Sequence, residues 1–79
     1  MIDLKELIEF IIKGIVDFPD KVEIDHIAAE KTSVFEIKVD PGDVGKVIGK
    51  QGRNIKSIRS IMNAAAQKSE KRVIIEIVN

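Results

Sequence analysis

The sequence predicts a single α+β domain in which three helices pack on one face of a three-stranded sheet. Its 79 residues suffice for one small hydrophobic core. Three segments place apolar residues at spacings of three and four, which is typical of one-sided helices, and three others alternate apolar with polar residues as strands do. These segments follow one another in the order α-β-β-α-α-β. Because each is apolar on one side only, we expect the helices on one face of the sheet and a polar opposite face.

The first segment is an amphipathic helix of about fifteen residues. Asp3 and Glu6 have the spacing of a capping box at its start. Pro19 follows its end, and the residue before a proline avoids helical angles. The apolar stripe consists of Leu4, Leu7, Ile8, Ile11, Ile12, Ile15 and Val16.

Two strands come next, over residues 21–31 and 33–40, with a turn near Lys31-Thr32. The first contains Val22, Ile24 and Ala28 in rough alternation, and the second places Phe35, Ile37 and Val39 on one face. All three phenylalanines of the chain, Phe10, Phe18 and Phe35, are expected in the core.

A short helix, a long helix and a third strand complete the chain. Pro41-Gly42-Asp43 ends the second strand and begins the short helix, which runs to Ile48. The long helix covers residues 53–68, and the third strand covers residues 72–78 with Val73, Ile75 and Ile77 on one face. The inward side chains of the long helix are expected to be Ile55, Ile58, Ile61, Met62 and Ala65.

The segment between the two helices, Gly49-Lys50-Gln51-Gly52, carries the main functional signal. Two glycines allow a tight turn, and the helix that follows begins at Arg53 with unpaired amides, so we expect the amides of Arg53 and Asn54 to attract an anion. A Gly-x-x-Gly spacing alone is weak, because at about 7% glycine it occurs by chance in roughly one chain in three of this length. The flanking Val47-Ile48 and Ile55 and the nearby cations strengthen it.

Residues 47–55 match a Val-Ile-Gly-x-x-Gly-x-x-Ile run between two helices, and so the chain resembles the KH family of RNA-binding domains. The element order is the type II arrangement of that fold, and the resemblance spans the whole chain. It implies that the glycine loop clamps the backbone of about four single-stranded nucleotides. The implied RNA-binding residues are Gly49, Lys50, Gln51, Gly52, Arg53 and Asn54, with Lys46, Lys56 and Arg59 as a basic track and Ile48, Ile55 and the strand 73–78 as an apolar groove floor.

The charge distribution agrees with a polyanion at one face. Residues 1–40 hold five Lys and Arg against ten Asp and Glu, a net charge of −5, whereas residues 41–72 hold eight against two, a net charge of +6. The chain contains no Trp or Tyr, the usual stacking platforms for single-stranded bases, so we expect one copy to bind weakly.

Other classes of function are disfavoured. There is no cysteine, and the only histidine, His26, has no partners at ligand spacing, so no metal, cofactor or catalytic constellation is expected. Neither Gly45-Lys46 nor Gly49-Lys50 is followed by Ser or Thr, which excludes a phosphate-binding P-loop. No apolar run is long enough for a membrane helix. We expect a cytoplasmic protein without enzymatic activity or a small-molecule substrate.

The resemblance to small bacterial KH proteins further implies an RNA chaperone or post-transcriptional regulator that acts as a homodimer or with a second KH protein, with effects on cell-wall homeostasis and cell length. Pairing would suit a weak module, because the second contact becomes intramolecular. Ile61, Met62 and Ala65 on the long helix are the candidate dimer surface. The alternative is a protein-interaction module in which the loop is vestigial.

Overall fold

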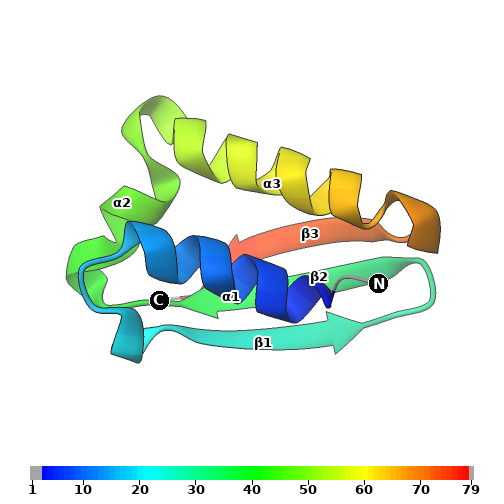
Figure 1. Cartoon of the computed structure of the whole chain (residues 1–79), viewed down its shortest axis with the longest axis horizontal. Coiled ribbons are helices and arrows are strands. Elements are labelled where there is room, and N and C mark those ends of the chain that lie inside the picture. The colour runs from blue at the N-terminus through cyan, green and yellow to red at the C-terminus, as the bar shows by residue number, and fades with distance from the viewer. Residues whose placement is uncertain (1–2, 79) are drawn as a thin grey trace.

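Three helices lie on one side of a three-stranded sheet in the computed structural model, which describes residues 3–78 (Figure 1). The predicted α-β-β-α-α-β order is confirmed. The elements are α1 (Leu4–Ile15), β1 (Glu23–Ala28), β2 (Thr32–Lys38), α2 (Val44–Ile48), α3 (Arg53–Ala65) and β3 (Arg72–Ile77). Short 3-10 turns at Pro19–Lys21, Pro41–Asp43, Lys50–Gly52 and Gln67–Ser69 join them.

The strands are arranged in the order β1-β2-β3, with β2 in the centre. β1 and β2 form an antiparallel hairpin in which His26 lies opposite Phe35. β3 pairs with β2 in parallel, with Phe35 opposite Ile75. A parallel pair needs a crossover connection, and here α2 and α3 provide it. β3 is therefore an edge strand next to the two helices that flank the glycine loop.

Both long helices begin as predicted and end earlier. The Asp3 carboxylate accepts hydrogen bonds from the amides of Lys5 and Glu6, at 2.9 and 3.2 Å, and so caps α1. α1 ends at Ile15, because the backbone is already extended at Val16. α3 ends at Ala65, where a 3-10 turn leads to a left-handed Glu70.

The core lies between the helices and the face of the sheet that they cover. Alternation on β2 buries Ser33, Phe35 and Ile37, as the sequence pattern predicted for the two apolar residues. His26 is exposed at the edge of this layer and stacks on the ring of Phe35, with 4.4 Å between ring centroids. The buried hydrophobic residues are Ile8, Ile12, Val16, Ile24, Phe35, Ile37, Val39, Val47, Ile55, Ile58, Met62, Ala66, Val73 and Ile75.

Three apolar residues that were expected in the core lie at the surface. Phe10 is 80% exposed and Phe18 is 51% exposed, so of the three phenylalanines only Phe35 is buried. Phe10 is two positions from both buried residues of α1, Ile8 and Ile12, and side chains two apart do not share a helix face. Ile61 is 47% exposed, because Ile58 and Met62 already fill the inward face of α3.

Candidate nucleic-acid interface

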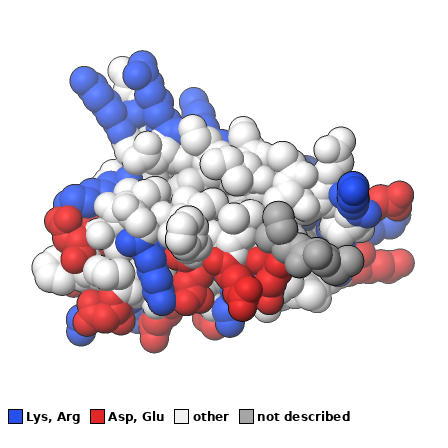
Figure 2. Space-filling model, in the orientation of Figure 1, with Lys and Arg blue, Asp and Glu red and all other residues white. Residues whose placement is uncertain are grey.

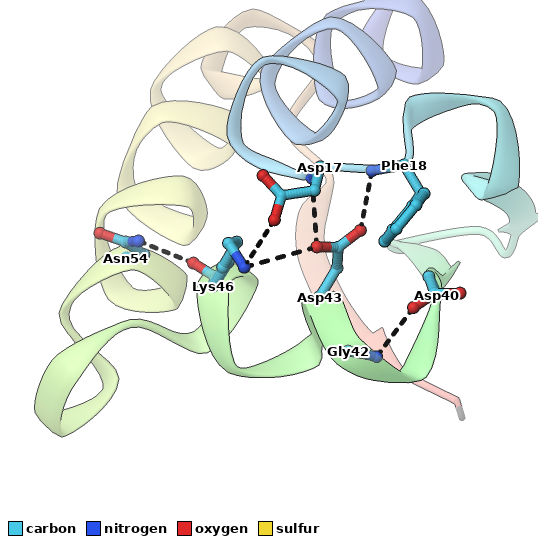
Figure 3. Close-up of polar contacts among 7 residues, drawn as sticks. All are labelled: Asp17, Phe18, Asp40, Gly42, Asp43, Lys46 and Asn54. Carbon is cyan, nitrogen blue, oxygen red and sulfur yellow. Dashed lines mark hydrogen bonds and ion pairs between the residues drawn. The ribbon is translucent and has the colours of Figure 1, made fainter.

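A buried aspartate fixes the start of α2 against the end of α1 (Figure 3). The side chain of Asp43 is almost completely buried, and its two carboxylate oxygens accept hydrogen bonds from the amides of Asp17 and Phe18, at 3.1 and 3.0 Å. Those amides follow the last turn of α1, where the chain bends toward β1. Asp43 thus holds together two segments about 25 residues apart in the sequence.

Lys46 extends this cluster. Its Nζ lies 3.0 Å from the Asp17 carboxylate and 3.8 Å from that of Asp43. The hydrogen bond to Asp17 and the negative charge of that residue raise the pKa of Lys46 above its usual value of 10.5. Lys46 was predicted to extend the basic track, and in the structure its ammonium group lies beside two carboxylates of the same chain.

At the end of α2 the backbone makes a turn that requires glycine at position 49. The Gly49 amide donates to the carbonyl of Gly45, and the residue has φ +78° and ψ 168°. A Cβ at this position would lie 2.7 to 2.8 Å from the backbone nitrogen and side chain of Asn54. Asn54 in turn donates from Nδ2 to the carbonyl of Lys46, at 2.8 Å. The predicted RNA contact Asn54 is therefore a residue that closes the loop against the last turn of α2.

The rest of the loop is a tight 3-10 turn with exposed polar side chains. Gln51 and Gly52 both have positive φ, 57° and 73°. The amide of Gly52 donates to Gly49, and that of Arg53 donates to Lys50. The expectation of an unpaired Arg53 amide is therefore wrong. The amides of Lys50 and Gln51 precede the first hydrogen-bonded turn, which makes them the better candidates for an anion.

A groove of about 500 Å³ runs beside the loop between α2, α3 and β3. It brings together residues that are distant in the sequence, because β3 is the strand adjacent to the two helices. Ile48 is 38% exposed and Ile55 is nearly buried, so Ile48 presents the larger apolar surface. The residues that line the groove are Ile48, Ile55, Arg59, Ile75, Glu76 and Ile77.

Lys and Arg side chains gather over the loop between α2 and α3, and acidic side chains lie along the opposite side of the molecule, near β1 (Figure 2). Lys50, Arg53, Lys56 and Arg59 are all exposed. The Arg53 guanidinium also contacts the Gln51 side chain oxygen, at 3.3 Å. These four cations lie on the loop and the first half of α3, and of the four only Arg59 lines the groove.

The three residues proposed for a dimer surface occupy different environments. Ile61 is exposed, Ala65 is partly buried, and Met62 is completely buried in the core of the chain. The Met62 side chain is therefore not available on this surface, which corrects that assignment. Phe10, exposed on α1, adds apolar surface to the helical layer, because α1 packs against α3.

The residues that position the loop were not predicted from the sequence. Asp43 was expected only to begin the short helix, and no role was predicted for Asp17 near the end of the first helix. A carboxylate that begins a helix is a recognisable signal, but its partners lie outside the local sequence. Ile75 and Ile77, by contrast, belong to the strand that was proposed as the groove floor, and the structure places both in the lining of the groove, with Glu76 between them.

Comparison with known proteins places this arrangement in a family. The family model described as the KH domain of KhpA/KhpB matches residues 5–77, which includes the loop, the groove and the Asp43 cluster. The chain belongs to this family. No solved structure gave a significant match.

Several curated members of the KhpA/KhpB family are similar over almost their entire length. A protein of Clostridium acetobutylicum is 49% identical over 75 residues, which is 95% of this chain and 100% of the relative. One of Aquifex aeolicus is 48% identical, with 95% of each chain covered, and one of Chlamydia trachomatis is 37% identical, with 95% and 96% covered. All three are named RNA-binding protein KhpA.

Within residues 3–78, no three His, Asp or Glu side chains are grouped so that they could hold a metal ion. In the same part of the chain, no helix has the length and apolar character that would let it cross a membrane.

Proposed function

We propose that the chain binds single-stranded RNA, with phosphates at the loop 49–52 and bases in the groove between α2, α3 and β3. The main observation in support of this proposal is that the loop and the groove are continuous. Gly49 and Gly52 frame the loop, and Ile48 and Ile55, immediately outside it, line the groove. A strand of nucleotides that touches the loop with its backbone would place its bases against an apolar wall.

Each part of the site would make a different kind of contact with the RNA. The missing side chain at Gly49 allows the two helices to approach, and the exposed Lys50 and Gln51 offer a charge and hydrogen-bond donors to phosphate oxygens. Ile48 and Ile77 offer apolar surface to the bases, and Arg59 offers donors and a planar cation. Because no Trp or Tyr is present, the affinity of one site should be low.

The decisive test is the double variant Lys50→Asp/Gln51→Asp. Added negative charge at a phosphate contact should abolish binding of a short single-stranded RNA, measured by fluorescence anisotropy at low salt. A matched control is Gln67→Asp/Lys68→Asp, which makes the same charge change at the other end of α3 on two exposed residues. Equal RNA affinity in the two double variants would contradict the clamp and favour the alternative, a protein-interaction module with a vestigial loop.

Salt dependence gives an independent measure of the same contact. If two to four phosphates are neutralised, log Kd against log salt should have a slope of about 1.4 to 2.8 in magnitude, at roughly 0.7 per contact on single strands. A slope near zero would show that the loop does not meet phosphates.

The proposal includes action in the cytoplasm as an RNA chaperone or post-transcriptional regulator with effects on the cell wall and cell length, as a homodimer or with a KhpB-like KH protein. For the homodimer, the exposed Ile61 is the central candidate, with Ala65 beside it. Ile61→Asp should give monomers by light scattering. Since Ile61 is at the surface, the fold should survive, and circular dichroism verifies it. Dimers that persist in a folded variant would exclude this surface.

A further inference from the structure

The face of the sheet that the helices leave uncovered carries an apolar row. Ile27, Val34 and Ile74 lie directly opposite one another on β1, β2 and β3. They alternate with residues that are directed toward the helices, such as Phe35 and Ile75, and so lie on the opposite face. Ile27 is 51% exposed and the other two are partly exposed. Three aliphatic side chains thus form a continuous row across the whole sheet.

The adjacent row on the same face is acidic. Asp25, Glu36 and Glu76 lie opposite one another on the three strands. Like charges that face each other across strands are destabilising, and among residues 3–78 the ion pairs involve other carboxylates, those of Glu9, Asp17 and Asp43. Among residues 3–78, no ion pair involves the acidic row, although Lys38 lies in the next row of the same face, opposite Glu23. The three carboxylates would repel the backbone of a nucleic acid.

We propose that this uncovered face binds a protein partner through a basic amphipathic helix. The apolar row would receive the apolar stripe of the partner helix, and the acidic row would pair with Lys or Arg at the border of that stripe. The charge pattern selects this occupant, because carboxylates beside an apolar row attract a basic peptide and exclude RNA.

The dimensions fit a helix. Neighbouring strands are about 4.8 Å apart, so the apolar row spans roughly 10 Å, which is close to two helical turns of about 5.4 Å each. Consecutive rows on one face are two residues apart along a strand, or roughly 7 Å, which is the distance that a Lys at the border of the partner's apolar stripe must span. None of Ile27, Val34 and Ile74 lines the RNA groove, whereas Glu76 of the acidic row lines it as well, so the two sites meet at Glu76 on the edge strand β3.

The test uses the whole chain, labelled with ¹⁵N, and a synthetic peptide of about 18 residues, long enough to form a helix, with Leu on one face and Lys along its border. We expect saturable shift changes at the amides of β1, β2 and β3 around Ile27, Val34 and Glu36, and weaker binding at higher salt. The same peptide with Ser in place of Leu, or Glu in place of Lys, should not bind. Shifts that map to the helical layer or the loop instead, or equal binding of the Ser peptide, would overturn the proposal.

Matched variants make the result specific. Ile27→Ser should weaken peptide binding about fivefold or more, whereas Phe18→Ser, at an equally exposed apolar residue between α1 and β1, should change it less than about twofold. Glu36→Lys should abolish binding, and Glu6→Lys on α1 should not. Equal effects within either pair would refute the proposal. Concentration-dependent shifts of this face without peptide would assign it to a second copy of the chain, and shifts with a short RNA would assign it to nucleic acid, so either result would also overturn it.

Discussion

The substitution Gly49→Ala should be far more damaging than the same change at Gly52, although both glycines belong to the same loop and both have positive φ. At Gly49 the backbone has φ +78° and ψ 168°, a region that is essentially restricted to glycine and costs another residue about 1–3 kcal/mol. The added Cβ would also lie 2.8 Å from the backbone nitrogen of Asn54. Relief of that contact requires movement of α3 relative to α2, which costs about a further 1–3 kcal/mol.

At Gly52 the situation is milder. The backbone is in the left-handed helical region, with φ 73° and ψ 16°, which costs a residue with a Cβ about 1–2 kcal/mol. Its added Cβ would meet only Cγ2 of Ile55, at an ordinary contact distance of 3.9 Å. The two variants therefore have the same chemical change in the same loop, and differ in the space available and in the backbone region.

The free energy of unfolding should fall by about 2–6 kcal/mol in Gly49→Ala and by about 1–2 kcal/mol in Gly52→Ala. In a domain of this size, about 1 kcal/mol corresponds to roughly 4–8 °C in Tm, so Gly49→Ala should melt about 10 °C or more below the parent. Urea denaturation and thermal melting, both followed by circular dichroism, give the two quantities. Equal losses, or a larger loss for Gly52→Ala, would refute the account of the loop.

Three other predictions follow from the cluster at the start of α2 and from the groove. Asp43→Ala should lower the free energy of unfolding by about 3 kcal/mol in urea titrations, because the amides of Asp17 and Phe18 lose their acceptor; an effect below about 1 kcal/mol would contradict the anchor. The raised pKa of Lys46 means that its ion pair stabilises the fold below pH 10.5 and is lost as the pH rises through the raised value, so urea midpoints should fall more at alkaline pH in the parent than in Lys46→Gln. If the urea midpoints of the parent and of Lys46→Gln fall equally as the pH rises, the ion pair of Lys46 does not stabilise the fold. Arg59→Gln should weaken RNA binding in anisotropy assays without a change in Tm, and unaltered affinity would remove Arg59 from the site.

The element order could be predicted because the spacing of apolar residues and the positions of the turn-forming residues indicate the same helices and strands along the chain. Alternation at Phe35, Ile37 and Val39 specified a strand, and the three- and four-residue spacing around Ile8 and Ile12 specified a helix. The exposure of Phe10 could also have been inferred, since it falls outside the apolar stripe of α1. Ile61 was expected to face inward, and this was wrong because the neighbouring Met62 occupies the inward position.

Within the site, the loop consists of consecutive residues and could therefore be predicted. The contacts that hold it in place involve residues that are distant in the sequence and could not. Gly49 and Gly52 indicate a turn, and their spacing can be read directly from the sequence. The Asp43 anchor and the ion pair of Lys46 with Asp17 depend on how α1 ends in space relative to α2, which no local pattern encodes. The role of Asn54 in closing the loop likewise emerges only when the end of α2 and the start of α3 are placed together.

The central claim is that RNA meets the loop and the groove together. The most direct measurement is a titration of the ¹⁵N- and methyl-labelled chain with a single-stranded RNA of about four nucleotides, the length that a KH loop clamps. The account predicts saturable shift changes at the amides of Gly49 to Gly52 and at the methyl groups of Ile48, Ile55 and Ile77, with Ile27 on the uncovered face unchanged. Shifts at Ile27 with an unperturbed loop, or no saturable change in either region, would contradict it.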